Sequence, residues 1–163
     1  LTFTMSGISK ISGLPQMKFS WLAISGPEDL KSQALNRMEM IADTYLSMNA
    51  PIQLAAPIFL QQRSSFQRQL MARVRENLAV LDSQLAAYSH LSRLEVEGGW
   101  YAIVRVPATR PDEDLAIELL EKHDVYVHPG HFYDLPSDGY LVVSLITPVA
   151  EFAEGVRRMM AAV

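Results

Sequence analysis

The 163-residue chain contains no cysteine, which excludes disulfides and thiolate metal sites. No stretch approaches the roughly 18 consecutive apolar residues of a membrane helix, and no secretion signal opens the chain. Positive charge is also scarce, because 14 Lys and Arg against 18 Asp and Glu give a net charge of −4. With 49% hydrophobic residues, these absences predict a globular, cytoplasmic protein that binds neither nucleic acid nor membrane.

Lysine is rare as well, with only four in the chain, and two of them share one short stretch. Lys10 and Lys18 lie eight residues apart in the sequence SGISKISGLPQMK, which we call the lysine loop (residues 6–18). One amine can form an imine with a carbonyl cofactor, and a second cation nearby can neutralise a phosphate on the same cofactor. This is the pairing that pyridoxal phosphate requires, so the lysine loop is the strongest functional signal of the sequence.

The residues around the lysine loop predict a strand, a loop, a second strand and a helix. Residues 1–5 predict a strand that leads directly into the loop, with neither an initiator Met nor a turn before it, so we expect the chain to be part of something longer. Residues 19–24 have the aromatic and aliphatic run of a buried strand. Ser25 and Glu28 have the spacing of a capping box, which predicts a helix that continues to Met48.

The rest of the chain has an α+β pattern. A connecting segment at residues 51–62 is interrupted by Pro57, and after Ser64 and Ser65 the apolar spacing predicts a long helix over residues 66–88. Beyond it, the predicted strands are 94–97, 100–106, 125–128 and 140–146, and the predicted helices are 112–122 and 148–160.

At this point the sequence resembles a known family. Gly7 to Lys10, followed by Gly13 and Leu14, is similar to the lysine loop of the class I/II aminotransferases, which are fold-type I pyridoxal-phosphate enzymes. Further similar segments, in the family's order, are Trp21 to Pro27, Gly99 to Tyr101, and the Pro-Gly loop formed by Val127 to Gly130 with Phe132. The likeness extends over nearly the whole chain.

The resemblance implies an α/β fold in three parts. Residues 1–50 would be the C-terminal part of a large cofactor-binding domain, residues 51–62 a connecting segment, and residues 63–163 a small C-terminal α+β domain. The family's N-terminal half, which supplies the other wall of the active site, would be missing from this sequence. The full-length enzyme would then be a homodimer, and the fragment alone would be catalytically inactive.

The resemblance also assigns roles to residues. Lys10 would be the catalytic residue, forming the Schiff base (aldimine) with pyridoxal 5′-phosphate and moving a proton while an amino group passes between an amino acid and a 2-keto acid. Lys18 would bind the cofactor phosphate where the family usually has an arginine, which exchanges a planar fork for a point charge. Ser6 and Ser9 would donate hydrogen bonds to that phosphate, or else satisfy backbone groups of the turn.

The sequence departs from the family where the substrate carboxylate should bind. Val142 aligns with the arginine that usually grips the α-carboxylate. Arg105, in an otherwise apolar strand, could replace it as a substrate-binding residue, or could instead be held in an ion pair or reach solvent. Alternatively, the carboxylate is bound by residues outside this sequence, or the substrate is unusual.

Other functions stay open. His128 and His131 with Asp134 make a weak metal-site pattern, and no metal is expected. An aminotransferase-like domain could serve as the ligand sensor of a transcription regulator, which a basic helix-turn-helix region before residue 1 would reveal. A fold-type I amino-acid lyase is the third possibility, since fold resemblance does not separate reactions.

Overall fold

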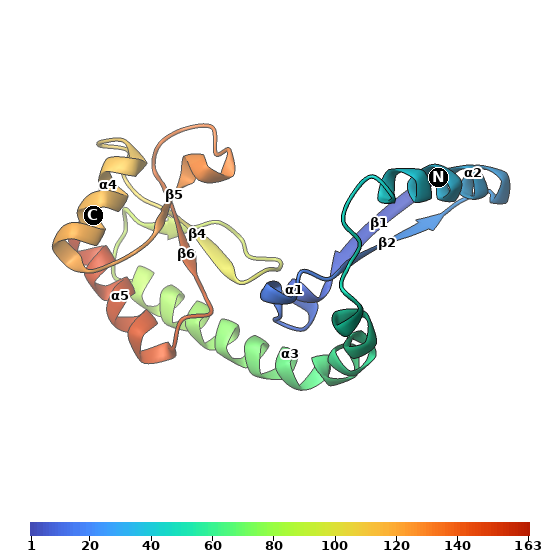
Figure 1. Ribbon diagram of the computed structural model, residues 1–163. Coiled ribbons are helices and arrows are strands. Elements are labelled where there is room, and N and C mark those ends of the chain that lie inside the picture. Colours follow the sequence, from blue (N-terminus) through green and yellow to red (C-terminus); the bar gives the residue numbers. More distant parts are fainter. The chain divides into compact units, whose positions relative to one another are not determined.

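The computed structural model describes all 163 residues, which form two compact units, residues 1–69 and residues 70–163 (Figure 1). Unit 1 contains β1 (Thr2–Gly7), α1 (Ile8–Ile11), the 3-10 helix η1 (Pro15–Met17), β2 (Ser20–Ser25), α2 (Glu28–Ala42) and the first part of α3 (Ala50–Leu85). Unit 2 contains the rest of α3, then β3 (Ser92–Arg93), β4 (Tyr101–Arg105), α4 (Asp112–His123), β5 (His128–Pro129), η2 (Gly130–Tyr133), β6 (Tyr140–Ser144) and α5 (Val149–Ala162). The mixture of helices and strands agrees with the predicted α/β class. No helix is both long enough and apolar enough to cross a membrane.

Unit 1 is built on a two-stranded antiparallel sheet that carries the lysine loop at one end. Strands β1 and β2 pair in register from Thr2 opposite Ser25 to Gly7 opposite Ser20, as expected from the two apolar runs. The expectation that the second run is buried is wrong, because neither strand has a covered face: Phe3 is 46% exposed, Met5 79% and Leu22 37%.

The helix after β2 differs from the prediction at both ends. Pro27 occupies the N-cap of α2, and no side chain caps the helix, so the Ser25 and Glu28 capping box does not form. The reason is that Ser25 is still the last residue of β2, two residues before the N-cap. The helix ends at Ala42 rather than at Met48.

Helix α3 is one continuous helix, although the sequence pattern predicted a break before residue 66. Its start is capped by Asn49, whose side-chain oxygen accepts a hydrogen bond from the Ile52 backbone N–H at 3.0 Å. Pro57 lies inside the helix, where it removes one backbone donor. Burial of Ile52 and Ala56 on the preceding turns stabilises the helix across the proline.

Unit 2 has a four-stranded antiparallel sheet in the order β3-β4-β6-β5. One face of the sheet packs on the hydrophobic core, which α3, α4 and α5 cover (Figure 1). The largest fully buried side chains of this core are Leu81, Leu119, Leu141, Leu145, Met159 and Met160. The two outer strands are shorter than predicted and shifted along the chain: β3 covers 92–93 rather than 94–97, and β5 covers 128–129 rather than 125–128.

A buried carboxylate connects α4 to β6. Asp112, the first residue of α4, accepts hydrogen bonds from the backbone N–H groups of Gly139 at 2.6 Å and Tyr140 at 3.1 Å. Its own N–H donates to the side chain of Asp138 at 3.1 Å. A Cβ at Gly130 would lie 3.0 Å from the Asp112 carboxylate and 2.8 Å from Tyr140 Cβ, which explains the glycine of the Pro-Gly loop.

Candidate functional site

Ile8 anchors the lysine loop. Its side chain is fully buried, its N–H donates to the Phe19 carbonyl at 3.1 Å, and its carbonyl accepts from Ser12 and Leu14 at 3.1 and 3.2 Å. A Cβ at Gly7 would lie 2.8 Å from the Phe19 carbonyl oxygen, so the two ends of the loop meet where only glycine fits. These contacts hold the short helix α1, from which Lys10 projects on the exposed side.

The start of α3 supports the same loop within unit 1. Ser12 donates a side-chain hydrogen bond to the Phe59 carbonyl at 3.2 Å, and Gln67 donates to the Ile11 carbonyl at 3.0 Å. Gly13 has a φ of +66°, and a Cβ there would lie 2.3 Å from the Phe66 ring. The turn that separates the two lysines is therefore determined by contacts with α3.

Lys18 has an unusual backbone. It lies in the left-handed region, with φ 52° and ψ 42°, at the end of η1. That conformation disfavours a side chain such as lysine. The Lys18 side chain is exposed, and no salt bridge of the structure includes it.

The two serines of the predicted site are half-buried at the same end of unit 1. Ser6 lies on β1 opposite Trp21, and Ser9 lies in α1 next to Lys10. Neither hydroxyl forms a hydrogen bond within the chain, so they do not satisfy the turn backbone. The loop thus contains the exposed amine of Lys10, a second cation and two hydroxyl donors. This donor set fits an aldehyde cofactor that carries a phosphate.

The predicted carboxylate-binding position lies in unit 2. Val142 is 5% exposed on the face of β6 that points away from the core, opposite Ile103 and His128. Arg105 lies on the same face of the sheet and is exposed. Its guanidinium carbon lies 5.6 Å from the centre of the Tyr140 ring, and Nη2 donates to the Tyr140 hydroxyl at 3.4 Å. Arg105 forms no salt bridge, so the ion-pair alternative does not occur in the structure.

Sequence reasoning missed a set of aromatic side chains on that face. His128 Nδ1 lies 2.7 Å from the Tyr133 hydroxyl, and Nε2 lies 2.9 Å from the Tyr126 hydroxyl. In an extended segment, side chains two residues apart lie on the same side. This alternation could have predicted from the sequence that Tyr126 and His128 lie together. The position of Tyr133 depends on η2, which the sequence pattern did not predict. His131 belongs to the same loop, and no group of three His, Asp or Glu side chains in the structure could hold a metal ion.

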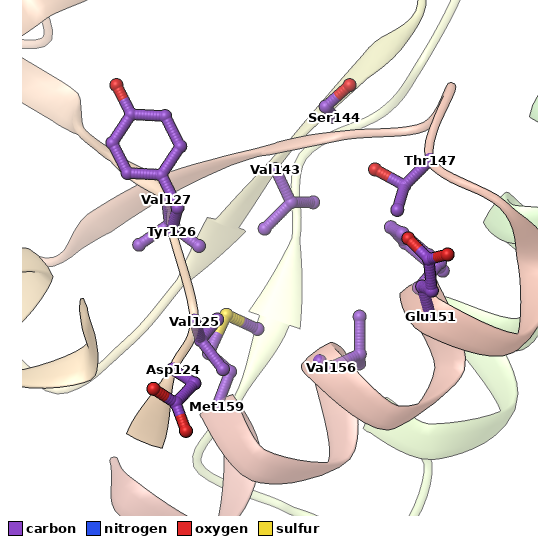
Figure 2. Close-up of a pocket in the computed structure, with 12 residues that line it drawn as sticks. Asp124, Val125, Tyr126, Val127, Val143, Ser144, Thr147, Glu151, Val156 and Met159 are labelled. Carbon is purple, nitrogen blue, oxygen red and sulfur yellow. The ribbon is translucent and has the colours of Figure 1, made fainter. Parts of the chain in front are cut away.

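A cavity of unit 2, of about 360 Å³, lies between α5 and the segment before β5 (Figure 2). Val143, Val156 and Met159 point into it, while the carboxylates of Asp124 and Glu151 lie at opposite ends. None of the residues predicted from the sequence as site residues lines this cavity. The lysine loop therefore remains the candidate active site.

Comparison with known proteins agrees with this geometry. The family model described as aminotransferase class I and II matches residues 2–156. The chain belongs to this family. An alanine aminotransferase of Mycobacterium tuberculosis (strain H37Rv) is 24% identical over 98% of the chain. The chain spans only 38% of that relative's length.

Solved structures of aminotransferases have the same fold. The alanine aminotransferase from Pyrococcus furiosus superposes with a TM-score of 0.85 at 18% identity, covering 98% of this chain and 42% of the other. A pyridoxal-phosphate-dependent aminotransferase from Streptococcus suis has a TM-score of 0.76 at 18% identity, covering 98% and 41%. Membership of the aminotransferase family implies pyridoxal phosphate as the cofactor, which the donor set of the lysine loop fits.

Proposed function

We propose that this chain is the part of a pyridoxal-phosphate-dependent aminotransferase that carries the cofactor lysine. The whole enzyme would move an amino group between an amino acid and a 2-keto acid. The observation that carries this proposal is the presence of Lys10 and Lys18 on one loop whose shape is determined by buried contacts at Ile8 and Gly13. The matched family and the resemblance of the loop support it.

Lys10 supplies the amine that attaches the cofactor. Its position on α1 suits this role, since the opposite side of the helical turn is fixed by buried Ile8 and Ser12 while the lysine side is exposed. When bound, the cofactor supplies the electron sink that stabilises charge on the substrate carbon. The Lys10 amine would also move a proton to and from the reacting carbon.

Lys18 and the two serines hold the phosphate. The left-handed backbone at Lys18 restricts the direction in which its side chain leaves the loop. Ser6 and Ser9 contribute neutral donors that are not used elsewhere in the chain. Arg105 is the candidate for the substrate α-carboxylate, because among the arginines of the strands it alone shares the sheet face of Val142.

The domain assignment and the assembly are further parts of the proposal. Residues 1–50 belong to the large domain, residues 51–62 connect, and residues 63–163 form the small domain. The whole enzyme is a homodimer, and residues 1–163 alone are inactive. Sedimentation of the whole enzyme and an assay of the isolated chain test these two statements directly.

The experiment that tests the function compares Lys10→Ala with Lys31→Ala in the whole enzyme. Lys31 is the matched control, because it lies on α2 of the same unit and its amine pairs with Glu28 at 2.6 Å. Lys10→Ala should abolish both the visible absorption band of the bound cofactor and amino transfer, whereas Lys31→Ala should retain both. Retention of the band in Lys10→Ala would refute the proposal. Release of ammonia without need for a 2-keto acid would point to a lyase instead.

A further inference from the structure

The cavity shown in Figure 2 lies where one edge of the unit 2 sheet opens. Strand β5 has only two residues, and residues 124–127 before it form no pair with β6. The space between this segment and α5 is the cavity of about 360 Å³, which we call the α5 cavity. Gly155 of α5 lines it, and a Cβ there would meet no atom within 4 Å, so the helix leaves this space unfilled.

The walls of the α5 cavity are apolar side chains of the core. Val143, Phe152, Val156 and Met159 line it, and each of them is at most 5% exposed. Protein interiors are normally packed without voids of this size. A dry apolar cavity of about 150 Å³ binds benzene, and ligand pockets commonly have volumes of about 300–1,000 Å³. The α5 cavity therefore has the size and the lining of a small-molecule site.

The charged groups of the α5 cavity are all negative. Asp124 and Glu151 line it at opposite ends (Figure 2), and no Lys, Arg or His lines it. Asp124 lies 3.7 Å from Arg158, whereas Glu151 forms no ion pair within the chain. Glu151 lies in the first turn of α5, where the helix dipole contributes only about half a positive charge. The full negative charge of Glu151 exceeds that contribution, so this end of the cavity attracts a cation.

The Glu151 end of the cavity also offers a neutral acceptor. Thr147 lines the cavity directly before Pro148, the N-cap of α5, and its hydroxyl forms no hydrogen bond within the chain. An ammonium group has three donors and can donate to both the Glu151 carboxylate and the Thr147 hydroxyl. A carboxylate ligand at this end would be repelled, and an uncharged apolar ligand would leave Glu151 without a partner.

We propose that the α5 cavity binds a hydrophobic primary amine. The apolar body of the ligand lies against Val143, Val156 and Met159, and its ammonium group donates to Glu151 and Thr147. The proposal uses residues of unit 2 alone and does not depend on the role of Lys10.

The first test compares probes that share a six-carbon chain and differ in the head group. In ligand-detected NMR with the full chain, hexylammonium should bind about fivefold more tightly than hexanol, and hexanoate should bind most weakly. Equal affinities for hexylammonium and hexanol, tighter binding of hexanoate, or no binding of hexylammonium would each overturn the proposal.

The second test uses substitutions to locate the bound probe. Gly155→Leu adds a side chain to the open space and should abolish hexylammonium binding, with circular dichroism to check that the variant folds. Glu151→Gln should weaken hexylammonium binding about fivefold and leave hexanol binding unchanged. Glu121→Gln is the matched control, because Glu121 is an exposed acid of α4 that does not line the cavity. Hexylammonium binding that resists either Gly155→Leu or Glu151→Gln, or that weakens equally in Glu121→Gln, would overturn the proposal.

The third test addresses a second copy of the chain as the occupant of the cavity. Sedimentation of the chain and of Gly155→Leu should give the same oligomeric state, with or without hexylammonium. A dimer that either the substitution or the probe dissociates would assign the α5 cavity to self-association and overturn the proposal.

Discussion

The two units differ in how their hydrophobic residues are used. Every residue of the main hydrophobic core, from Val74 to Met160, belongs to unit 2. Unit 1 buries few side chains, among them Ile8, Ala34 and Ile52, and exposes the apolar residues of its two-stranded sheet. A two-stranded sheet is marginally stable by itself. Unit 1 should therefore be much less stable than unit 2.

The candidate active site thus lies in the unit that we expect to be the less stable one. The lysine loop is determined by a few contacts, such as the Ile8 hydrogen bonds and the fit of Gly13 against Phe66. These contacts fix the conformation of the loop but provide little burial. The two tryptophans allow the units to be compared, because Trp21 reports on unit 1 and Trp100 on unit 2.

The largest difference should follow from removing one leucine from each sheet. Leu141 is fully buried in the unit 2 core, so Leu141→Ala should lower the free energy of unfolding of unit 2 by about 2–5 kcal/mol. Leu22 is partly exposed, so Leu22→Ala should change unit 1 by less than about 1 kcal/mol. Urea titrations followed by fluorescence, in Trp21→Phe and Trp100→Phe backgrounds, measure each unit. Equal losses of unfolding free energy in both units would contradict the expected difference between them.

A methyl group added at Gly13 should specifically destabilise unit 1. Gly13→Ala places a Cβ against the Phe66 ring at a positive φ, so we expect a loss of about 1–3 kcal/mol in the unit reported by Trp21. Gly98→Ala is the control, because nothing lies within 4 Å of a Cβ there. If both variants behave alike, the lysine loop is not held by its packing on α3.

Lys18→Gly should separate stability from binding. Glycine tolerates the left-handed backbone, so unit 1 should gain about 1 kcal/mol, while the affinity for pyridoxal phosphate should fall. Lys18→Arg should retain cofactor affinity, because the positive charge remains. Trp21 fluorescence during unfolding measures the stability of unit 1, and equilibrium titration with pyridoxal phosphate measures the affinity for the cofactor. An unchanged affinity in Lys18→Gly would argue against a phosphate ligand at this position.

The smallest effect concerns the partly exposed Glu154 of unit 2, which forms ion pairs with two arginines. Hydrogen bonds from Arg157 and Arg158 lower the pKa of Glu154 from 4.5 to about 2. Since the folded pKa is below the unfolded one, the stabilisation is complete above pH 4.5 and is lost as the pH falls toward about 2. The melting temperature of Glu154→Gln should thus be slightly below that of the wild type near pH 7 and should match it near pH 2. A difference in melting temperature that persists at pH 2 would contradict this explanation.

Much of the fold could be predicted because local patterns and packing agree. The strands that flank the lysine loop were expected, and helix α4 was expected at 112–122 and occurs at Asp112–His123. The patterns failed where tertiary contacts override local signals. Pro57 does not end the helix, in which Ile52 and Ala56 before it are buried. Ser25 does not cap a helix because it still pairs with Thr2.

The site could be predicted only in part. Lys10 and Lys18 could be selected as candidate site residues because lysine is rare in this chain and the two lie eight residues apart. Their roles stay predictions. The left-handed backbone of Lys18 and the fit of Gly13 to Phe66 depend on contacts with η1 and α3, which spacing does not reveal. The pairing of His128 with two tyrosines required the path of η2. These features follow from tertiary structure rather than from periodicity.

The central claim is that Lys10 attaches the cofactor, and the chain's four lysines make it directly testable. The cofactor-loaded protein would be reduced with borohydride, digested, and mapped by mass spectrometry to find which lysine carries the added pyridoxyl phosphate mass. The account predicts the modification on the peptide that contains Lys10, and not on Lys18, Lys31 or Lys122. Modification of one of those three instead, or no modification of this chain, would contradict it.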